Sequence, residues 1–126
     1  MHMWRRLATD FPVEIVPGVT GMSGCWARAA MPMTWGDDVL TVLTGTLPED
    51  ELARRLIQTD AAVIMKVGRH LPKVRRAVEA AGLLARAVYV ERGSMADERI
   101  IALTEAPPER GPYFSMVLIG GQGRAL

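Results

Sequence analysis

Residues 13–27 read VEIVPGVTGMSGCWA, a succession typical of a strand, a tight turn and a helix. Val13–Val16 predicts the strand because β-branched residues predominate there. Pro17-Gly18 favours a sharp reversal, since proline presets φ and glycine accepts positive φ. Thr20 is a suitable N-cap for a helix over residues 21–30. Such a turn can present backbone amides to a ligand, but the residue pattern alone indicates only an ordinary strand–helix junction.

The composition indicates one main domain with a hydrophobic core, because the chain has 126 residues of which 49% are hydrophobic. A net charge of +1 gives no general affinity for nucleic acid or membranes. The single cysteine, Cys25, excludes an internal disulfide and fits a reducing compartment. No apolar run approaches the ~20 residues of a membrane span, and no signal peptide is recognisable, so we expect a soluble, cytoplasmic protein.

Strand and helix patterns alternate from residue 39 onward. The apolar runs predict strands over residues 39–43, 61–65, 86–91, 99–104 and 113–119. Helical spacing predicts two helices, whose buried faces comprise Leu52, Ala53, Leu56, Ile57, Leu71, Val74, Val78 and Ala81. The link over residues 92–98 is too short for a crossover helix, which predicts an antiparallel hairpin. These elements predict an α/β fold with a mixed β-sheet of about five strands flanked by helices.

The remaining segments are predicted to be less regular. Residues 1–10 have the spacing of a short amphipathic helix, and residues 31–38 read as a connector that ends in Asp37-Asp38. Adjacent residues on an extended segment point to opposite sides, so this acidic pair is not expected to bind a metal. Gly120–Gly123 is predicted to be a frayed tail.

Other metal or nucleophile chemistry is not indicated. His2 and His70 are far apart in the sequence, and with a single cysteine the chain offers no credible zinc ligand set. Cys25 lies beside Trp26 on a weakly amphipathic helix, where packing is a better explanation than nucleophilic catalysis.

Three segments of the chain resemble one known family: VPGVTGMSGCWA from residue 16, WGDD from residue 35 and VYVERGSM from residue 88. They look like the corresponding segments of the tetrapyrrole (corrin/porphyrin) methyltransferases, and most closely like the branch that methylates precorrin-2 at C-20. The resemblance extends from about Phe11 to the last strand but covers only about half of the family's architecture. It implies that the cofactor is S-adenosyl-L-methionine and that the substrate is a tetrapyrrole, precorrin-2.

The resemblance also implies which residues bind the cofactor. In this family the residues after PGV lie at the cofactor, a methionine at the end of a strand contacts its adenine, and a later loop and the last strand complete the pocket. These positions correspond to Thr20, Gly21, Met65, Gly93, Ser115 and Met116. Ordinary packing of Met65 in a core, and strand initiation at Ser115, explain two of these positions without a ligand.

A basic cluster follows the strand over residues 61–65, and no acidic residue lies between Ala61 and Val78. Lys66, Arg69 and His70 lie in the turn after that strand, where they would match the carboxylates of a corrin precursor. Further along, Lys73, Arg75 and Arg76 are more typical of a solvated helix face. Nucleic acid binding is poorly supported, because no aromatic residues interleave with the basic ones.

The resemblance divides the chain at residue 38. Residues 1–38 correspond to an interdomain segment with the last strand of an N-terminal domain and a linking helix, and residues 39–126 to a C-terminal α/β domain. The family's upstream glycine-rich loop has no counterpart, so we expect a fragment that is inactive alone. For the parent enzyme we expect a homodimer. Two alternatives remain open: a methyltransferase acting on another precorrin or cobalt-precorrin, and a non-catalytic tetrapyrrole-binding or assembly domain.

Overall fold

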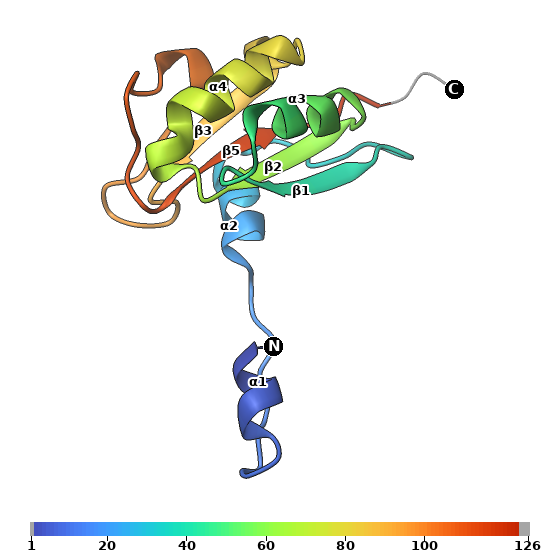
Figure 1. Ribbon diagram of the computed structural model, residues 1–126, viewed down its shortest axis with the longest axis vertical. Coiled ribbons are helices and arrows are strands. Elements are labelled where there is room, and N and C mark those ends of the chain that lie inside the picture. Colours follow the sequence, from blue (N-terminus) through green and yellow to red (C-terminus); the bar gives the residue numbers. More distant parts are fainter. Residues whose placement is uncertain (1, 124–126) are drawn as a thin grey trace.

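A mixed five-stranded sheet forms the centre of the computed structural model, which describes residues 2–123 (Figure 1). Its strands are β1 (Leu40–Thr44), β2 (Ala61–Met65), β3 (Ala87–Glu91), β4 (Arg99–Ala102) and β5 (Ser115–Ile119). Their spatial order is β1-β2-β5-β3-β4; β1 and β2 are parallel, and every other neighbouring pair is antiparallel. The predicted α/β class and the predicted β3–β4 hairpin are therefore confirmed.

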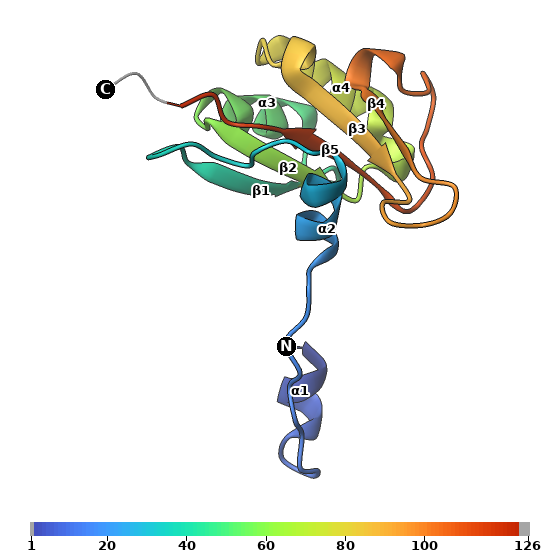
Figure 2. The same ribbon diagram turned by 180° about the vertical axis from the view of Figure 1, so that it is seen from behind.

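Helices cover both faces of the sheet (Figures 1 and 2). One face carries α3 (Glu49–Ile57) and α4 (Leu71–Ala80), and the other carries α2 (Gly21–Arg28). The first helix, α1 (His2–Leu7), lies away from the sheet at the end of an extended segment. Short 3-10 turns occur over Gly68–His70, Leu84–Arg86 and Leu103–Glu105.

The larger core lies between the sheet and α3 and α4. Leu52 and Leu56 of α3 and Leu71, Val74 and Val78 of α4 are buried there, as their spacing predicts. The prediction that Ile57 is buried is wrong, because this side chain is 67% exposed. Ile57 follows Leu56 directly at the last position of the helix and therefore points away from the buried face.

The smaller core lies under α2. Cys25 and Trp26 pack there against Val63, Val90 and Leu118 from the three central strands. The predicted cap is present, because the backbone N–H of Ser23 donates to the Thr20 hydroxyl at 3.1 Å. At the other end of α2, Arg28 makes a 2.6 Å ion pair with Glu98 in the β3–β4 loop, which fixes the helix across the sheet.

The strand predicted over Val13–Val16 does not form within the described residues. This segment pairs with none of β1–β5, and Ile15 and Val16 are exposed. Its residues have strand propensity, but a strand needs a neighbour for its backbone groups, and none of the described strands lies beside it.

The frayed tail predicted for Gly120–Gly123 is also wrong, because this segment packs on the connector before β1. The backbone N–H of Gly121 donates to the carbonyl of Met33 at 2.9 Å. The Asp38 carboxylate accepts from the backbone N–H of Trp35 and from that of Gly123, both at 3.0 Å. Asp38 therefore joins the connector to the chain beyond β5.

Replacing Asp38 with alanine should lower the free energy of unfolding by about 1 kcal/mol, because two backbone N–H groups lose a charged acceptor. Urea denaturation measures the change. Asp37→Ala is the matched control, since Asp37 makes no hydrogen bond or ion pair within residues 2–123. Equal destabilisation by both substitutions would contradict this role for Asp38.

Candidate functional site

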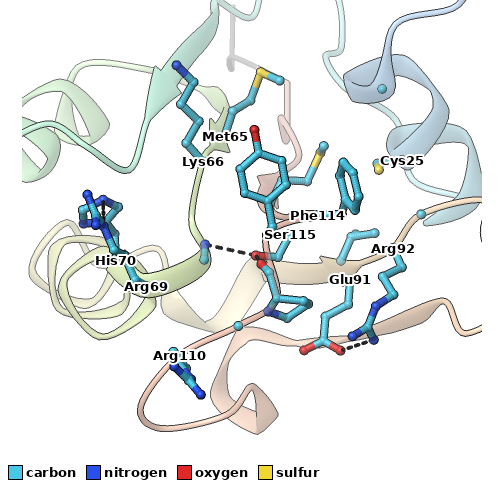
Figure 3. Close-up of a pocket in the computed structure, with 18 of the residues that line it drawn as sticks. Cys25, Met65, Lys66, Arg69, His70, Glu91, Arg92, Arg110, Phe114 and Ser115 are labelled. Atoms are coloured by element: carbon cyan, nitrogen blue, oxygen red, sulfur yellow. Dashed lines mark hydrogen bonds and ion pairs between the residues drawn. The ribbon is translucent and has the colours of Figure 1, made fainter.

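The ends of three central strands meet at one edge of the sheet. Because β5 runs antiparallel to β2 and β3, its first residue lies beside the last residues of both, with Ser115 paired to Glu91 and Val117 to Ile64. The loops that leave these strand ends surround an open pocket with a volume of about 1210 Å³ (Figure 3). Ligands commonly bind at such edges of α/β sheets.

All but one of the residues predicted to form the site line this pocket. The lining includes Gly21, Met65, Lys66, Arg69, His70, Gly93, Ser115 and Met116. The exception is Thr20, whose hydroxyl caps α2 and also lies 3.0 Å from the Ser23 hydroxyl. Residues predicted from separate segments of the chain are thus brought to one place, and their roles toward a ligand remain predictions.

One end of the pocket is apolar. Met65, Val90 and Met116 line it together with Cys25, which is itself nearly buried. Burial raises the pKa of the Cys25 thiol above its ordinary value, and the Glu98 carboxylate raises it further. The thiol is therefore protonated at neutral pH, which agrees with a packing role rather than a nucleophilic one.

Gly93 is required by packing on this thiol. A Cβ atom at residue 93 would lie 2.5 Å from the Cys25 sulfur and 3.4 Å from a methyl carbon of Val90. The glycine thus allows the β3–β4 loop to approach α2, and the loop forms one wall of the pocket as a result.

The other end of the pocket is cationic. Arg69 and His70 lie there, as does Arg110, which the sequence analysis did not single out, whereas Lys66 lies beside Met65 (Figure 3). In Figure 3, Arg69, His70 and Arg110 lie on the opposite side of the pocket from Cys25. Arg110 occupies a proline-rich loop remote in sequence, so only the folded structure reveals its position.

The acidic side chain that lines the pocket, Glu91, does not neutralise this cationic end. Its carboxylate lies 3.5 Å from Arg99 and 3.9 Å from Arg92, and it is almost completely buried. No ion pair joins Lys66, Arg69 or Arg110 to an acidic residue among residues 2–123. The cationic end is therefore free to pair with an anionic ligand.

Ser115 holds two loops of the pocket together. Its hydroxyl donates to the carbonyl of Pro112 at 2.8 Å and accepts from the backbone N–H of Gly68 at 3.1 Å. The backbone N–H of Gly111 also donates to the carbonyl of Gly68, at 3.0 Å. The Ser115 side chain is 6% exposed, so its hydroxyl fixes loop positions rather than projecting into the pocket.

The buried Tyr89 hydroxyl lies beneath the same loops. Burial raises the pKa of Tyr89 to about 12, although a contact with the Ser115 hydroxyl acts in the opposite direction. A Cβ atom at residue 111 would overlap the Tyr89 hydroxyl, so glycine is needed for this close approach. Tyr89 is therefore a protonated structural residue below the pocket.

The pocket loops contain unfavourable backbone conformations. Lys66 and Arg92 line the pocket and have φ values of 55° and 48°, and Ser94 follows with 67°. A left-handed conformation costs each such residue roughly 1–2 kcal/mol, whereas glycine adopts it without this penalty. Backbone strain of this kind is concentrated at functional sites.

Two exposed aromatic residues also line the pocket, and Phe114 lies on the same side as Cys25 (Figure 3). Tyr113 is 85% exposed and Phe114 is 62% exposed, and their rings meet edge to face with centroids 5.1 Å apart. They give the pocket an exposed aromatic surface made of two nearly perpendicular rings.

Residues 2–123 contain no group of three or more His, Cys, Asp or Glu side chains that could hold a metal ion. No helix in the same range is long and apolar enough to cross a membrane.

The chain belongs to the family of tetrapyrrole (corrin/porphyrin) methylases, whose sequence description matches residues 1–107. It is 59% identical over 121 residues to a precorrin-2 C(20)-methyltransferase from Sinorhizobium sp., a match that covers 96% of this chain. The fold is also that of the methyltransferase CobJ, with a TM-score of 0.68, 19% identity and coverage of 94% of this chain and 57% of that one. A uroporphyrin-III C-methyltransferase from Thermus thermophilus, complexed with S-adenyl homocysteine, gives a TM-score of 0.61 at 23% identity, covering 90% of this chain and 55% of that one.

The chain spans about half the length of these relatives. The match covers 49% of the Sinorhizobium enzyme. The expected membership of the family is thus confirmed. The chain matches only part of the length of each of these relatives.

The histidine at the cationic end provides a test of this electrostatic description. Burial lowers the pKa of His70 below its ordinary value, and Lys73 and then Arg69 lower it further. Because the folded state disfavours the protonated imidazole, His70 should destabilise the fold as the pH falls through the unfolded-state pKa of about 6.5.

Replacing Lys73 with glutamine should raise the pKa of His70, since a nearby positive charge is removed. An NMR titration of the imidazole protons measures this pKa directly. Arg76→Gln is the matched control on the same helix, because Arg76 pairs with Glu49 at 2.7 Å and does not affect His70. A pKa of His70 that is unchanged in Lys73→Gln would contradict the assigned cause.

Proposed function

We propose that this chain forms part of an S-adenosyl-L-methionine-dependent methyltransferase that methylates precorrin-2 at C-20 in cobalamin biosynthesis. The observation that carries the proposal is a pocket with an apolar end and a cationic end, in a chain closely similar to an enzyme of that name. A precorrin carries many carboxylates, and unpaired Lys and Arg side chains bind carboxylates through charge-assisted hydrogen bonds. The cationic end therefore suits such a substrate.

The apolar end fits the cofactor that the family implies. Met65 and Met116 offer polarizable thioethers to a flat ring, and Gly21 has open space around its Cα. We propose that these residues and the Gly93 backbone hold S-adenosyl-L-methionine, which supplies the methyl group when bound. Thr20 and Ser115 would act on this site indirectly, one by capping α2 and the other by fixing the loops.

The pocket is suited to a reaction that needs alignment rather than a side-chain base. Methyl transfer to a carbon of an electron-rich macrocycle depends on orientation and exclusion of water. Glu91 is paired with arginines and Cys25 is a protonated thiol, so neither is prepared to act as a nucleophile. The described residues would bind and orient the reactants.

We further propose that residues 1–38 connect two domains and that residues 39–126 form the C-terminal one. The supporting feature is the extended segment before α2, where Ile15, Val16 and Val19 are all more than half exposed. Burying such side chains is strongly favourable, so a second domain is expected to cover them.

Methylation should require both halves of the enzyme. We expect this chain alone to leave precorrin-2 unchanged, and the chain mixed with the unmatched half of the Sinorhizobium enzyme to add one methyl group at C-20. Mass spectrometry and NMR of the product measure the outcome. Methylation at another carbon would identify a different precorrin methyltransferase, and methylation by this chain alone would contradict the two-domain proposal.

In that mixture, Met65→Ala should weaken S-adenosylhomocysteine binding about tenfold, because the adenine would lose an apolar contact surface. Calorimetry measures the dissociation constant. Met65→Leu is the matched control, since it preserves the volume and should bind within about threefold of the original chain. Equal binding by the alanine variant would exclude Met65 from the cofactor site.

The exposed segment should also cause this chain to self-associate. The double substitution Ile15→Ser and Val16→Ser should shift the chain toward the monomer in sedimentation velocity, because less apolar surface would be available for burial. Val42→Ser is the control, since Val42 is similarly exposed but lies on β1. A chain that is monomeric without substitution would contradict the prediction.

A further inference from the structure

Arg110 and Arg69 are brought together by hydrogen bonds between their neighbours. Gly111 donates to Gly68 through the backbone at 3.0 Å, so the residues that flank this bond, Arg110 and Arg69, belong to two loops joined at one point. The Ser115 hydroxyl joins the same loops a second time through Gly68 and Pro112. The two guanidinium groups are therefore carried by a fixed pair of loops.

Neither arginine has an acidic partner. Arg69 donates to the Nε2 atom of His70 at 3.3 Å, and Arg110 forms no hydrogen bond or ion pair within residues 2–123. By contrast, several arginines elsewhere are paired at 2.6–2.8 Å, namely Arg28, Arg54, Arg55 and Arg76. Unpaired arginines that share one side of a pocket are suited to bind carboxylates, because the guanidinium group donates in a planar fork.

Two aromatic residues follow on the same loop as Arg110, three and four residues further along the chain. Tyr113 and Phe114 expose most of their rings to the pocket although the loop is held by backbone bonds, including one from the Arg92 N–H to the Phe114 carbonyl at 2.8 Å. Their planes lie at 80° to each other, so one of the two rings can stack on a flat π system while the other contacts its edge. Cations and aromatic rings on one loop together match a flat, polyanionic ligand.

We infer that Arg69 and Arg110, together with the exposed rings of Tyr113 and Phe114, form the subsite that binds the carboxylated macrocycle. This inference deepens the proposed function, on which it rests, by naming Arg110 and Tyr113 as residues that determine substrate affinity. The arginines bind peripheral carboxylates, and Tyr113 contacts the face of the ring system. Because the subsite lies entirely within this chain, the chain binds such a macrocycle without another domain.

The cofactor also carries a carboxylate, so the competing assignment is that Arg69 and Arg110 bind its amino acid end. The two assignments differ in what a substitution changes. If the arginines bind the macrocycle, Arg110→Gln weakens porphyrin binding and leaves S-adenosylhomocysteine binding unaffected. If they bind the cofactor, Arg110→Gln weakens S-adenosylhomocysteine binding and leaves porphyrin binding unaffected.

The experiment titrates this chain with uroporphyrin, which has a carboxylate on every peripheral side chain, and follows quenching of porphyrin fluorescence. We expect Arg110→Gln to weaken binding about fivefold and Tyr113→Ala about tenfold. Arg110→Lys should retain part of the affinity by keeping the charge, and Tyr113→Phe should retain nearly all of it. Raising the ionic strength should weaken binding by the original chain more than by Arg110→Gln.

Arg5→Gln is the control, because it removes the same charge from an exposed residue of α1, a helix that lies away from the sheet (Figure 1). Circular dichroism checks that each variant is folded. No measurable binding by the original chain, or equal weakening by Arg5→Gln and Arg110→Gln, would overturn the inference. Weakened S-adenosylhomocysteine binding with unchanged porphyrin binding, measured with both halves of the enzyme present, would overturn it in favour of the cofactor.

Methylation by the two-half mixture separates this inference from the proposed function. If the mixture methylates precorrin-2 and Arg110→Gln leaves the KM for precorrin-2 unchanged, the subsite is wrong and the function stands. If porphyrin binding shows the expected losses and the mixture does not methylate precorrin-2, the subsite stands and the proposed reaction is wrong.

Discussion

The pairing of β5 with both β2 and β3 is the constraint on which the rest of the structure depends. The strand is antiparallel to both neighbours, and Val117, Leu118 and Ile119 are completely buried. Its alternate side chains belong to the cores on the two faces of the sheet, so the helices pack on a surface that this strand completes. The same pairing brings the loops after β2 and β3 to the start of β5. The position of the pocket is therefore a consequence of how the sheet is closed.

Rigid loops are the second requirement of the site, and they are obtained at a local cost. Lys66 and Arg92 adopt left-handed conformations that glycine would tolerate better, yet both positions carry a cationic side chain. Hydrogen bonds through Ser115 and Gly111 hold the neighbouring loops against this strain. Hydrogen bonds in the buried layer below the pocket thus maintain unfavourable backbone conformations at the pocket surface. As a result, the charged groups are held in place before a ligand binds.

The sequence predicted those features that local pattern determines. Ala61–Met65 was predicted with its observed bounds because its side chains are apolar throughout, and the Thr20 cap was predicted from residue type. The strand order and the place of Arg110 were not predicted, since both depend on contacts between distant segments. Val13–Val16 has the right residues for a strand but has no neighbouring strand among the described residues. Gly120–Gly123 is ordered in part by the hydrogen bond from the Gly123 N–H to the Asp38 carboxylate, which no local pattern indicates. Of the site, the resemblance supplied several lining residues, among them Met65 and Gly93, whereas the bonding of the Ser115 hydroxyl required the structure.

The central position of β5 also has a consequence for the order in which the chain folds. Strands β1 and β2 and helices α3 and α4 are close in sequence, so they can associate as the chain leaves the ribosome. The β3–β4 hairpin is equally local. These two units have no direct strand pairing with each other, because β5 lies between them and is synthesised after both. Until that strand emerges, two apolar sheet edges stay unpaired, and nascent chains of this kind are vulnerable to aggregation and benefit from chaperones.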